Sequence, residues 1–212
     1  MKRLIAFLLL IVLSCSLFVA CDKSGESSSS DSSDANVSIT VEDGKNYYAT
    51  IDIIDYGVIT VKLEPSQAPI TVQNFIDLAQ SGFYDGLTFH RIISGFMMQG
   101  GDPKGNGTGD SGKDIYGEFA MNGHQNTLSH RRGVISMARA NDPNSASCQF
   151  FIVHNDMAAS SLDGKYAAFG YVTEGIEVVD KVCANARPVD SNGTILKDQQ
   201  PVIKTIKITV KD

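Results

Sequence analysis

Apolar and polar residues alternate in short runs from about residue 47 to residue 210, with turn residues between the runs. Residues 49–53 and 58–63 alternate on either side of an Asp-Tyr-Gly turn, a pattern typical of a β-hairpin. Residues 202–210 alternate in the same way and are expected to form the closing strand. A period of two therefore dominates the chain and predicts a mainly β fold.

Two segments change to an apolar spacing of three and four residues. Residues 68–82 have a proline near the start and a glycine at the end, which predicts a helix of about three turns. Residues 175–184 carry Ile176, Val179 and Val182 at helical spacing and predict a second helix. Many strands, two helices and short turns together predict an antiparallel β-barrel with helices over its ends.

The second half of the chain adds further strands and turns. Residues 133–153 contain two apolar strands around a polar turn at residues 141–144. Another turn at residues 162–165 precedes the apolar stretch 167–172. Residues 100–118 are rich in glycine but lack the spacing of a phosphate-binding loop, so we expect a long surface loop there.

The first residues have the pattern of an export signal. Lys2 and Arg3 precede a continuous apolar run, and small residues precede Cys21. Because the run is shorter than the roughly 20 residues that span a bilayer, we expect a cleaved leader over residues 1–20. Val-Ala-Cys resembles the lipobox of bacterial lipoproteins, so lipidation of Cys21 is expected. Lipidation at Cys15 and plain secretion are the alternatives.

The segment after Cys21 is almost entirely Ser, Asp, Glu, Gly and Lys up to residue 36. Such a segment cannot bury enough apolar surface to offset the entropy of ordering it. We therefore expect a disordered tether over residues 21–46 and one folded domain over residues 47–212. A tether of this kind holds a domain clear of the membrane to which it is anchored.

The charge balance limits the possible partners. The chain has 18 Lys and Arg against 24 Asp and Glu. Loss of Lys2 and Arg3 with the leader leaves 16 basic residues, and the net charge of the remainder is about −8. Nucleic acids and anionic lipids are bound by basic surfaces. We therefore expect neither as a general partner of the domain.

Residues 88–102 form an expected strand that ends in a glycine pair, and Arg91 lies in it among large apolar residues. Burial of a guanidinium is unfavourable unless the group is paired or has a functional role. Arg91 is therefore either a salt-bridged barrel residue or part of a site that also contains Phe96, Met97 and Gln99.

The side chains of common catalytic mechanisms do not stand in recognisable patterns. None of the four histidines has the spacing of a zinc site, and no nucleophile-elbow sequence is present. Cys148 and Cys183 are the cysteines of the expected domain. We expect two free, buried thiols, with a disulfide as the alternative for an exported protein. We expect no metal and no cofactor, and a hydrolase has no motif to support it.

An arginine, amides and large apolar side chains suit few reactions. One is rotation about the peptide bond before proline, which breaks no covalent bond and has an uncatalysed barrier of about 18–20 kcal/mol. An apolar pocket can hold the proline ring while a donor favours the twisted amide. A half-time of milliseconds requires about 5–7 kcal/mol, whereas one charged hydrogen bond contributes about 1.5–3 kcal/mol. Contacts to the flanking carbonyls must supply the rest.

Two stretches resemble the signature sequences of the cyclophilin-type peptidyl-prolyl cis-trans isomerases. They are FHRIISGFMMQGGD at residues 89–102, and GVISMARA followed by SCQFFI within residues 133–152. LDGKYAAFG at residues 162–170 resembles a third landmark of the family, and the similarity covers residues 47–210 in one order. The resemblance implies a closed eight-stranded antiparallel β-barrel capped by two α-helices. It also implies an isomerase that acts on proline-containing polypeptides without a cofactor.

The resemblance implies roles for particular residues. Arg91 corresponds to the catalytic arginine, which hydrogen-bonds the substrate backbone, and Gln99 to the glutamine that holds the carbonyl on the proline side. The implied proline pocket consists of Phe96, Met97, Phe151 and Leu162, with Tyr166 at its edge. The implied groove for the residues that precede proline is lined by Ala138, Arg139, Ala140 and Gln149.

Two positions depart from the family pattern. Ser161 stands where many members carry a tryptophan, and the chain has no tryptophan. Because the indole N–H of that tryptophan contacts cyclosporin, the departure puts cyclosporin binding in doubt. Tyr166 stands where many members carry a histidine and keeps an aromatic edge on the pocket.

Two functions follow from these observations. The first is an isomerase that assists exported proteins to fold outside the cytoplasm, and the second is a proline-binding module whose turnover is incidental. Arg91 and Gln99 favour the isomerase, because a pure binder needs no charge in an apolar cleft. We expect a monomer anchored by lipid at Cys21 to a bacterial membrane on its extracytoplasmic side, with secretion as the alternative.

Overall fold

The computed structural model describes residues 38–212. The predicted leader, Cys21 and most of the predicted tether lie outside the described residues. Within the described part, no helix is both long and apolar enough to cross a membrane.

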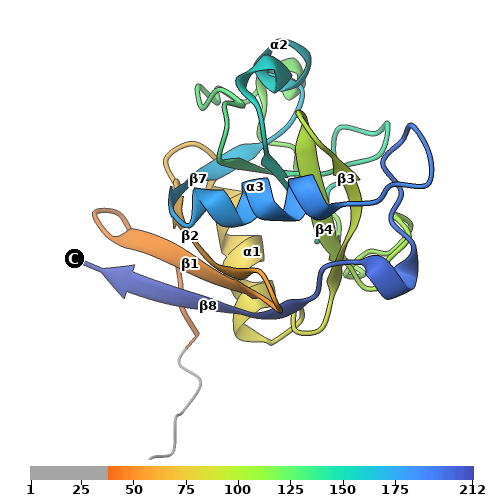
Figure 1. The fold of residues 1–212 in the computed structure, drawn as a ribbon. Coiled ribbons are helices and arrows are strands. Elements are labelled where there is room, and N and C mark those ends of the chain that lie inside the picture. The colour runs from red at the N-terminus through yellow and green to blue at the C-terminus, as the bar shows by residue number, and fades with distance from the viewer. Residues whose placement is uncertain (1–37) are drawn as a thin grey trace, which may run out of the picture. The chain divides into compact units, whose positions relative to one another are not determined.

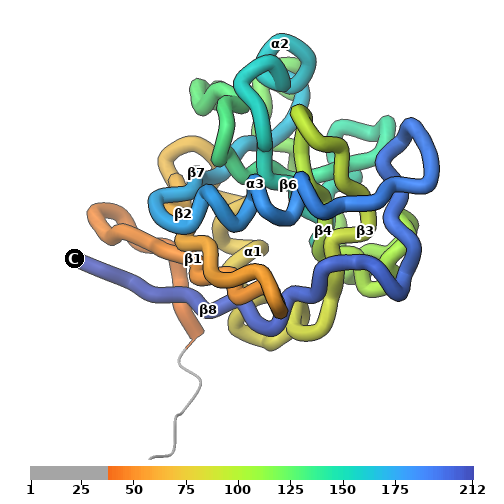
Figure 2. Tube along the Cα trace, viewed as in Figure 1, coloured from red at the N-terminus to blue at the C-terminus, as the bar shows by residue number. Residues whose placement is uncertain are grey.

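Eight strands form one antiparallel sheet in the order β3-β4-β6-β5-β7-β2-β1-β8 (Figure 1). The strands are β1 Asn46–Ile53, β2 Gly57–Leu63, β3 Thr88–Ile93, β4 Met97–Asp102, β5 Val134–Met137, β6 Phe150–Val153, β7 Ala168–Glu174 and β8 Ile203–Lys211. The β1–β2 hairpin and the strands expected in residues 133–153 and 202–210 are confirmed. Figure 2 follows the chain through the curled sheet, where β8 runs beside the β1–β2 hairpin.

Three α-helices accompany the sheet in the described residues: α1 Pro69–Gln80, α2 Ala159–Leu162 and α3 Ile176–Asn185. Short 3-10 turns lie at Ala120–Asn122, Asp156–Ala158 and Lys197–Gln199. The two expected helices correspond to α1, which packs on β8, and α3, which packs on β2 and β4. The prediction of only two helices is wrong, because α2 is a single turn of four residues and is too short to show a helical repeat.

The prediction of a closed barrel is also wrong. The sheet curls into a half-barrel whose edge strands, β3 and β8, form no continuous ladder with each other. An isolated bridge joins Thr88 to Val202, and the backbone N–H of Phe89 donates to the Pro201 carbonyl at 2.9 Å. Pro201 has no N–H to return that bond, and a 3-10 turn precedes it, so regular pairing cannot extend along this edge.

Residues 88–102 form a hairpin and not the single strand expected from the sequence. The chain reverses between β3 and β4 at Gly95, whose φ of +80° lies in the left-handed region that glycine adopts without strain. The reversal places Arg91 directly opposite Gln99 in the ladder. Two residues separated along the chain therefore become neighbours at the centre of the candidate site.

The main core lies between the sheet and α1. Phe75 of α1 contacts the rings of Tyr84, Phe150 and Phe169 at centroid distances of 5.2, 5.5 and 5.2 Å. All four side chains are fully buried. Burial of each large apolar side chain contributes about 1.5–3 kcal/mol relative to exposure, so this aromatic cluster holds α1 against the strands.

The described end of the predicted tether contacts α1. The backbone N–H of Ile39 donates to Gln80 Oε1 at 2.9 Å, and the N–H of Val41 donates to Gln73 Oε1 at 2.7 Å. Gln73 Nε2 donates in turn to the Ile39 carbonyl at 3.0 Å. Residues 39–41, assigned to the tether by composition, are thus held on the folded domain by side-chain amides that composition alone does not reveal.

A carboxylate from a distant loop caps the N-terminus of α1. The residue at the N-cap position is Ala68, which has no side-chain oxygen to accept hydrogen bonds from the first turn. Glu118 accepts instead from the backbone N–H groups of Ile70 at 3.0 Å and Thr71 at 2.8 Å, and from Thr71 Oγ1 at 2.7 Å. The buried carboxylate therefore satisfies donors that the helix leaves unpaired.

We predict that Glu118→Gln lowers the free energy of unfolding by about 1–3 kcal/mol. The amide oxygen of Gln accepts more weakly than a carboxylate, and its NH₂ group would face the N–H groups of the first turn of α1. Urea unfolding followed by circular dichroism measures the change, with the exposed Glu177→Gln in the first turn of α3 as the control. Equal unfolding midpoints for Glu118→Gln and the wild type would contradict the capping role.

Candidate active site

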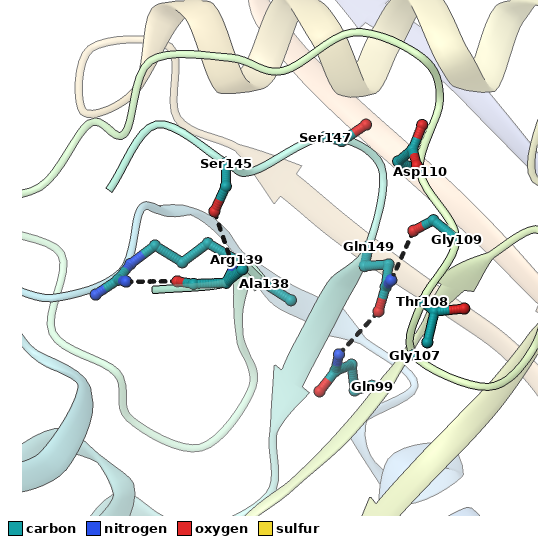
Figure 3. Close-up of a pocket in the computed structure, with 11 residues that line it drawn as sticks. Gln99, Gly107, Thr108, Gly109, Asp110, Ala138, Arg139, Ser145, Ser147 and Gln149 are labelled. Atoms are coloured by element: carbon teal, nitrogen blue, oxygen red, sulfur yellow. Dashed lines mark hydrogen bonds between the residues drawn. The ribbon is translucent and has the colours of Figure 1, made fainter. Parts of the chain in front are cut away.

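The β3–β4 hairpin presents a cation and an amide side by side. Arg91 Nη1 donates to Gln99 Oε1 at 3.3 Å. Gln99 Nε2 donates to Gln149 Oε1 at 3.0 Å, and Gln149 Nε2 donates to the Gly109 carbonyl at 2.8 Å. Figure 3 shows the last two contacts, which lead from Gln99 of β4 through Gln149 to Gly109 in the glycine-rich loop. Each amide fixes the orientation of the next, so Gln99 offers Arg91 its oxygen.

The Arg91 guanidinium is held without a carboxylate. Its Nε donates to the Asn192 carbonyl at 2.7 Å, and no salt bridge to Arg91 is formed within residues 38–212. Burial lowers the pKa of Arg91 from its usual value, with Tyr166 and Asp190 acting in the opposite direction. The group nevertheless remains charged near neutral pH. The alternative of a salt-bridged structural arginine is therefore not supported.

An apolar cavity of about 540 Å³ opens beside this guanidinium. It contains the residues expected to form the proline pocket, together with parts of the expected groove. The lining residues are Arg91, Phe96, Met97, Gln99, Ala138, Arg139, Phe151, Ser161, Leu162, Lys165 and Tyr166. A cavity lined by large apolar side chains, with the Arg91 guanidinium beside them, can bind an uncharged ring while presenting a charge to the atoms next to that ring.

A second cavity of about 300 Å³ shares Gln99, Ala138 and Arg139 with the first. Ala140 and Gln149 lie here and not in the apolar cavity. Figure 3 shows it between the Ala138–Arg139 segment and the glycine-rich loop. The remaining lining residues are Gly107, Thr108, Gly109, Asp110, Ser145 and Ser147. The eleven residues predicted for catalysis and substrate binding thus all line one or both of two adjoining cavities.

Sequence reasoning missed the loop residues of the site. The segment from Gly107 to Asp110 was expected only to be a surface loop, yet it walls the second cavity and anchors Gln149. Asn192 holds Arg91 through its backbone carbonyl from 101 positions away. A backbone contact depends on no particular side chain, so no sequence signal could have identified Asn192.

A Ser-His-Asp arrangement lies behind the apolar cavity. His130 Nδ1 is 2.8 Å from Asp163 Oδ1, and His130 Nε2 is 2.9 Å from Ser136 Oγ. Burial lowers the pKa of His130, with Asp163 opposing the shift. Ser136 is fully buried, so its hydroxyl cannot reach a substrate carbonyl as a nucleophile must. The arrangement therefore gives no support to a hydrolase.

The two cysteines offer no nucleophile either. Cys148 and Cys183 are both free and buried, as expected. Burial raises the pKa of Cys148 to about 11 and that of Cys183 to about 12. A thiol is a poor nucleophile unless it ionises. The chemistry of the site is thus that of a fixed cation, neutral amides and an apolar cavity.

Comparison with known proteins agrees with this chemistry. Residues 48–210 match the family model described as cyclophilin type peptidyl-prolyl cis-trans isomerase/CLD. A peptidyl-prolyl cis-trans isomerase of Helicobacter pylori is 45% identical over 140 residues, which are 65% of this chain and 81% of that protein. Peptidyl-prolyl cis-trans isomerase B of Bacillus subtilis is 44% identical over 144 residues, which are 68% of this chain and 90% of that protein.

Solved structures give the same result. A cyclophilin type peptidyl-prolyl cis-trans isomerase of Cryptosporidium parvum, crystallised in the presence of the dipeptide Ala-Pro, superimposes with a TM-score of 0.66 and 33% sequence identity. The match covers 76% of this chain and 98% of that one. The sequence match spans most of the folded region and the fold is shared. The chain therefore belongs to the cyclophilin family and is a peptidyl-prolyl cis-trans isomerase.

Proposed function

We propose that Arg91 and Gln99 are the catalytic residues of this isomerase, and that the apolar cavity receives the proline ring of a polypeptide. The barrier to rotation comes from conjugation between the carbonyl and the proline nitrogen, and it is about 18–20 kcal/mol. In the twisted amide the nitrogen lone pair is no longer conjugated. A cation directed at the substrate backbone stabilises that state more than either planar isomer, which is the requirement for catalysis.

The observation that carries this proposal is that Arg91 forms no salt bridge within residues 38–212. The guanidinium is held by the Asn192 carbonyl and the Gln99 amide oxygen, neither of which neutralises it. It lines the same cavity as Phe96, Met97 and Phe151. A charge fixed in a partly desolvated site acts on a developing dipole with little reorganisation.

Gln99 and the adjoining cavity provide the contacts that a single cation lacks. We propose that Gln99 holds the carbonyl on the proline side, and that the groove of Ala138, Arg139, Ala140 and Gln149 binds the residues that precede proline. When the segments on both sides of the X-Pro bond are bound, rotation of one segment relative to the other takes place about that bond. The Cryptosporidium relative crystallised with Ala-Pro supports proline-containing peptides as the ligand class.

We propose further that the enzyme acts on exported proteins outside the cytoplasm, where it assists their folding. The basic start, the apolar run and Val-Ala-Cys ending at Cys21 support lipid anchoring, and the Ser- and Asp-rich segment after them supports a tether. One acyl chain alone binds membranes reversibly, so stable anchoring requires the additional chains that a lipoprotein cysteine carries. A monomer on such a tether, about 25 Å in root-mean-square span for some 20 residues, reaches chains that emerge at the membrane.

Arg91→Ala is expected to lower kcat/KM on a short Ala-Pro peptide by at least about tenfold while the fold is retained. Arg91→Lys should recover little, because one ammonium cannot reproduce the planar fork. Exchange spectroscopy at substoichiometric enzyme measures the rate, with residues 22–212 of the wild type as the reference. Near-full activity of Arg91→Ala would remove Arg91 from the catalytic role, and a folded but inactive wild type would favour the proline-binding module.

Cyclosporin is expected to inhibit this chain weakly compared with relatives that carry the tryptophan, and Ser161→Trp should raise its affinity. Ser161 lines the apolar cavity, and its Oγ donates to the Ala158 carbonyl at 2.9 Å, so it offers the ligand neither an indole donor nor a large ring. Inhibition constants for the wild type, Ser161→Trp and Ser160→Trp, the last as a neighbouring control, test this. Tight inhibition of the wild type would refute it.

Lipid attachment is expected to place the mature protein in the membrane fraction, and Cys21→Ser should release it. Fractionation of bacterial cells and intact-mass measurement distinguish the lipidated form, with Cys15→Ser as the matched control. Soluble protein of unlipidated mass from both the wild type and Cys21→Ser would favour plain secretion.

A further inference from the structure

The Arg139 side chain lies between two aromatic rings. Its Cζ is 5.1 Å from the ring centroid of Phe119 and 4.8 Å from that of Tyr166. Phe119 is buried, and Tyr166 lines the apolar cavity. A guanidinium is attracted to aromatic faces and is flat enough to fit between two of them.

Two of the three nitrogens of this guanidinium donate to the protein backbone. Nε donates to the Lys165 carbonyl at 3.0 Å, and Nη1 donates to the carbonyls of Ala140 at 2.8 Å and Asn141 at 3.4 Å. Figure 3 shows the Arg139 side chain leading away from Thr108 and Gln149. Arg139 thus joins the segment after β5 to the loop that carries Tyr166.

Tyr166 transmits this constraint to the floor of the cavity. Its ring meets Phe151 edge-on, at a centroid distance of 5.8 Å and an interplanar angle of 87°. His130 also stacks on Phe151, at 6.1 Å and 18°, and is 2.8 Å from Asp163 Oδ1 through its Nδ1. Phe151 therefore contacts both Tyr166 and His130, and Arg139 fixes the Tyr166 end of this series.

We propose that Arg139 is a positioning residue, which sets the place of Tyr166 and through it the shape of the proline cavity. Its guanidinium does not recognise substrate charge. Family resemblance implies that this residue lines the groove for the residues before proline, and Arg139 does line both cavities. This role for Arg139 rests on the proposed function, in which the apolar cavity binds proline.

Arg139→Lys separates positioning from charge recognition. Lysine keeps the charge but cannot fill the space between two rings while donating to several carbonyls. We expect kcat/KM to fall about fivefold to tenfold, mainly through a higher KM, since a displaced Tyr166 weakens binding of both isomers. The loss should be equal for peptides with Glu, Gln or Lys two residues before proline.

Arg187→Lys is the matched control. The Arg187 guanidinium also donates to three backbone carbonyls, those of Ala184, Asn185 and Ala186. It lines neither of the two cavities of the site. Its kcat/KM should stay within about twofold of the wild type. A kcat/KM for Arg139→Lys that is equally unchanged, or a loss confined to the acidic peptide, would overturn the proposal.

A double-mutant cycle tests the route through Tyr166. Tyr166→Leu removes the ring, so adding Arg139→Lys to it should change kcat/KM by less than about twofold. Two fully additive losses would overturn the proposal. If Arg139→Lys does not fold, kcat/KM of the wild type on the Glu, Gln and Lys peptides still tests the proposal. A strong preference for the Glu peptide that high salt abolishes would mean direct charge recognition. Equal rates on the three peptides would support positioning. Absence of wild-type activity would instead count against the proposed function.

Discussion

The constraint on which the site depends is a guanidinium held beside an apolar cavity without a counter-ion. Removing such a charge from water is unfavourable, and a carboxylate would be the simplest partner. Here the compensation comes from neutral dipoles, the Asn192 carbonyl and the Gln99 amide oxygen. A neutral partner stabilises the cation but leaves its field available to a ligand. The reversal at Gly95, the line of amides to Gly109 and the loop around Asn192 all serve to keep those dipoles in place.

The rest of the fold makes this arrangement rigid. The aromatic cluster around Phe75 joins α1 to the strands, and Glu118 secures the start of that helix from a loop. The apolar cavity has its own smaller core, in which Phe151, Leu162 and Met97 are packed apart from the main one. A local change in the cavity wall therefore need not disturb the main core. A substitution at Ser161 or Tyr166, which line the cavity, can therefore leave the sheet unchanged.

The sequence predicted the elements whose signal is local. Alternation revealed the β1–β2 hairpin and β8, and helical spacing revealed α1 and α3. The turn at Gly95 was missed because apolar residues stand directly on both sides of Ser94 and Gly95, and α2 was missed because one helical turn has no repeat. Closure of the barrel was implied by resemblance and fails at Pro201, which cannot donate. The site residues came from the family signatures and not from periodicity. The contacts that orient them, from Asn192 and Gly109, involve backbone atoms of remote loops and leave no mark in the sequence.

The two buried thiols have a consequence for any environment in which the chain resides. Oxidants and alkylating agents react with thiolates, and because burial raises the pKa of Cys148 to about 11, this thiol is hardly ionised near neutral pH. Cys183 is ionised more rarely still. Burial and a raised pKa therefore both protect these sulfurs from thiol reagents in the native domain. Reaction requires the fold to open, so the rate at which a thiol reagent modifies Cys148 and Cys183 measures how often the native domain opens.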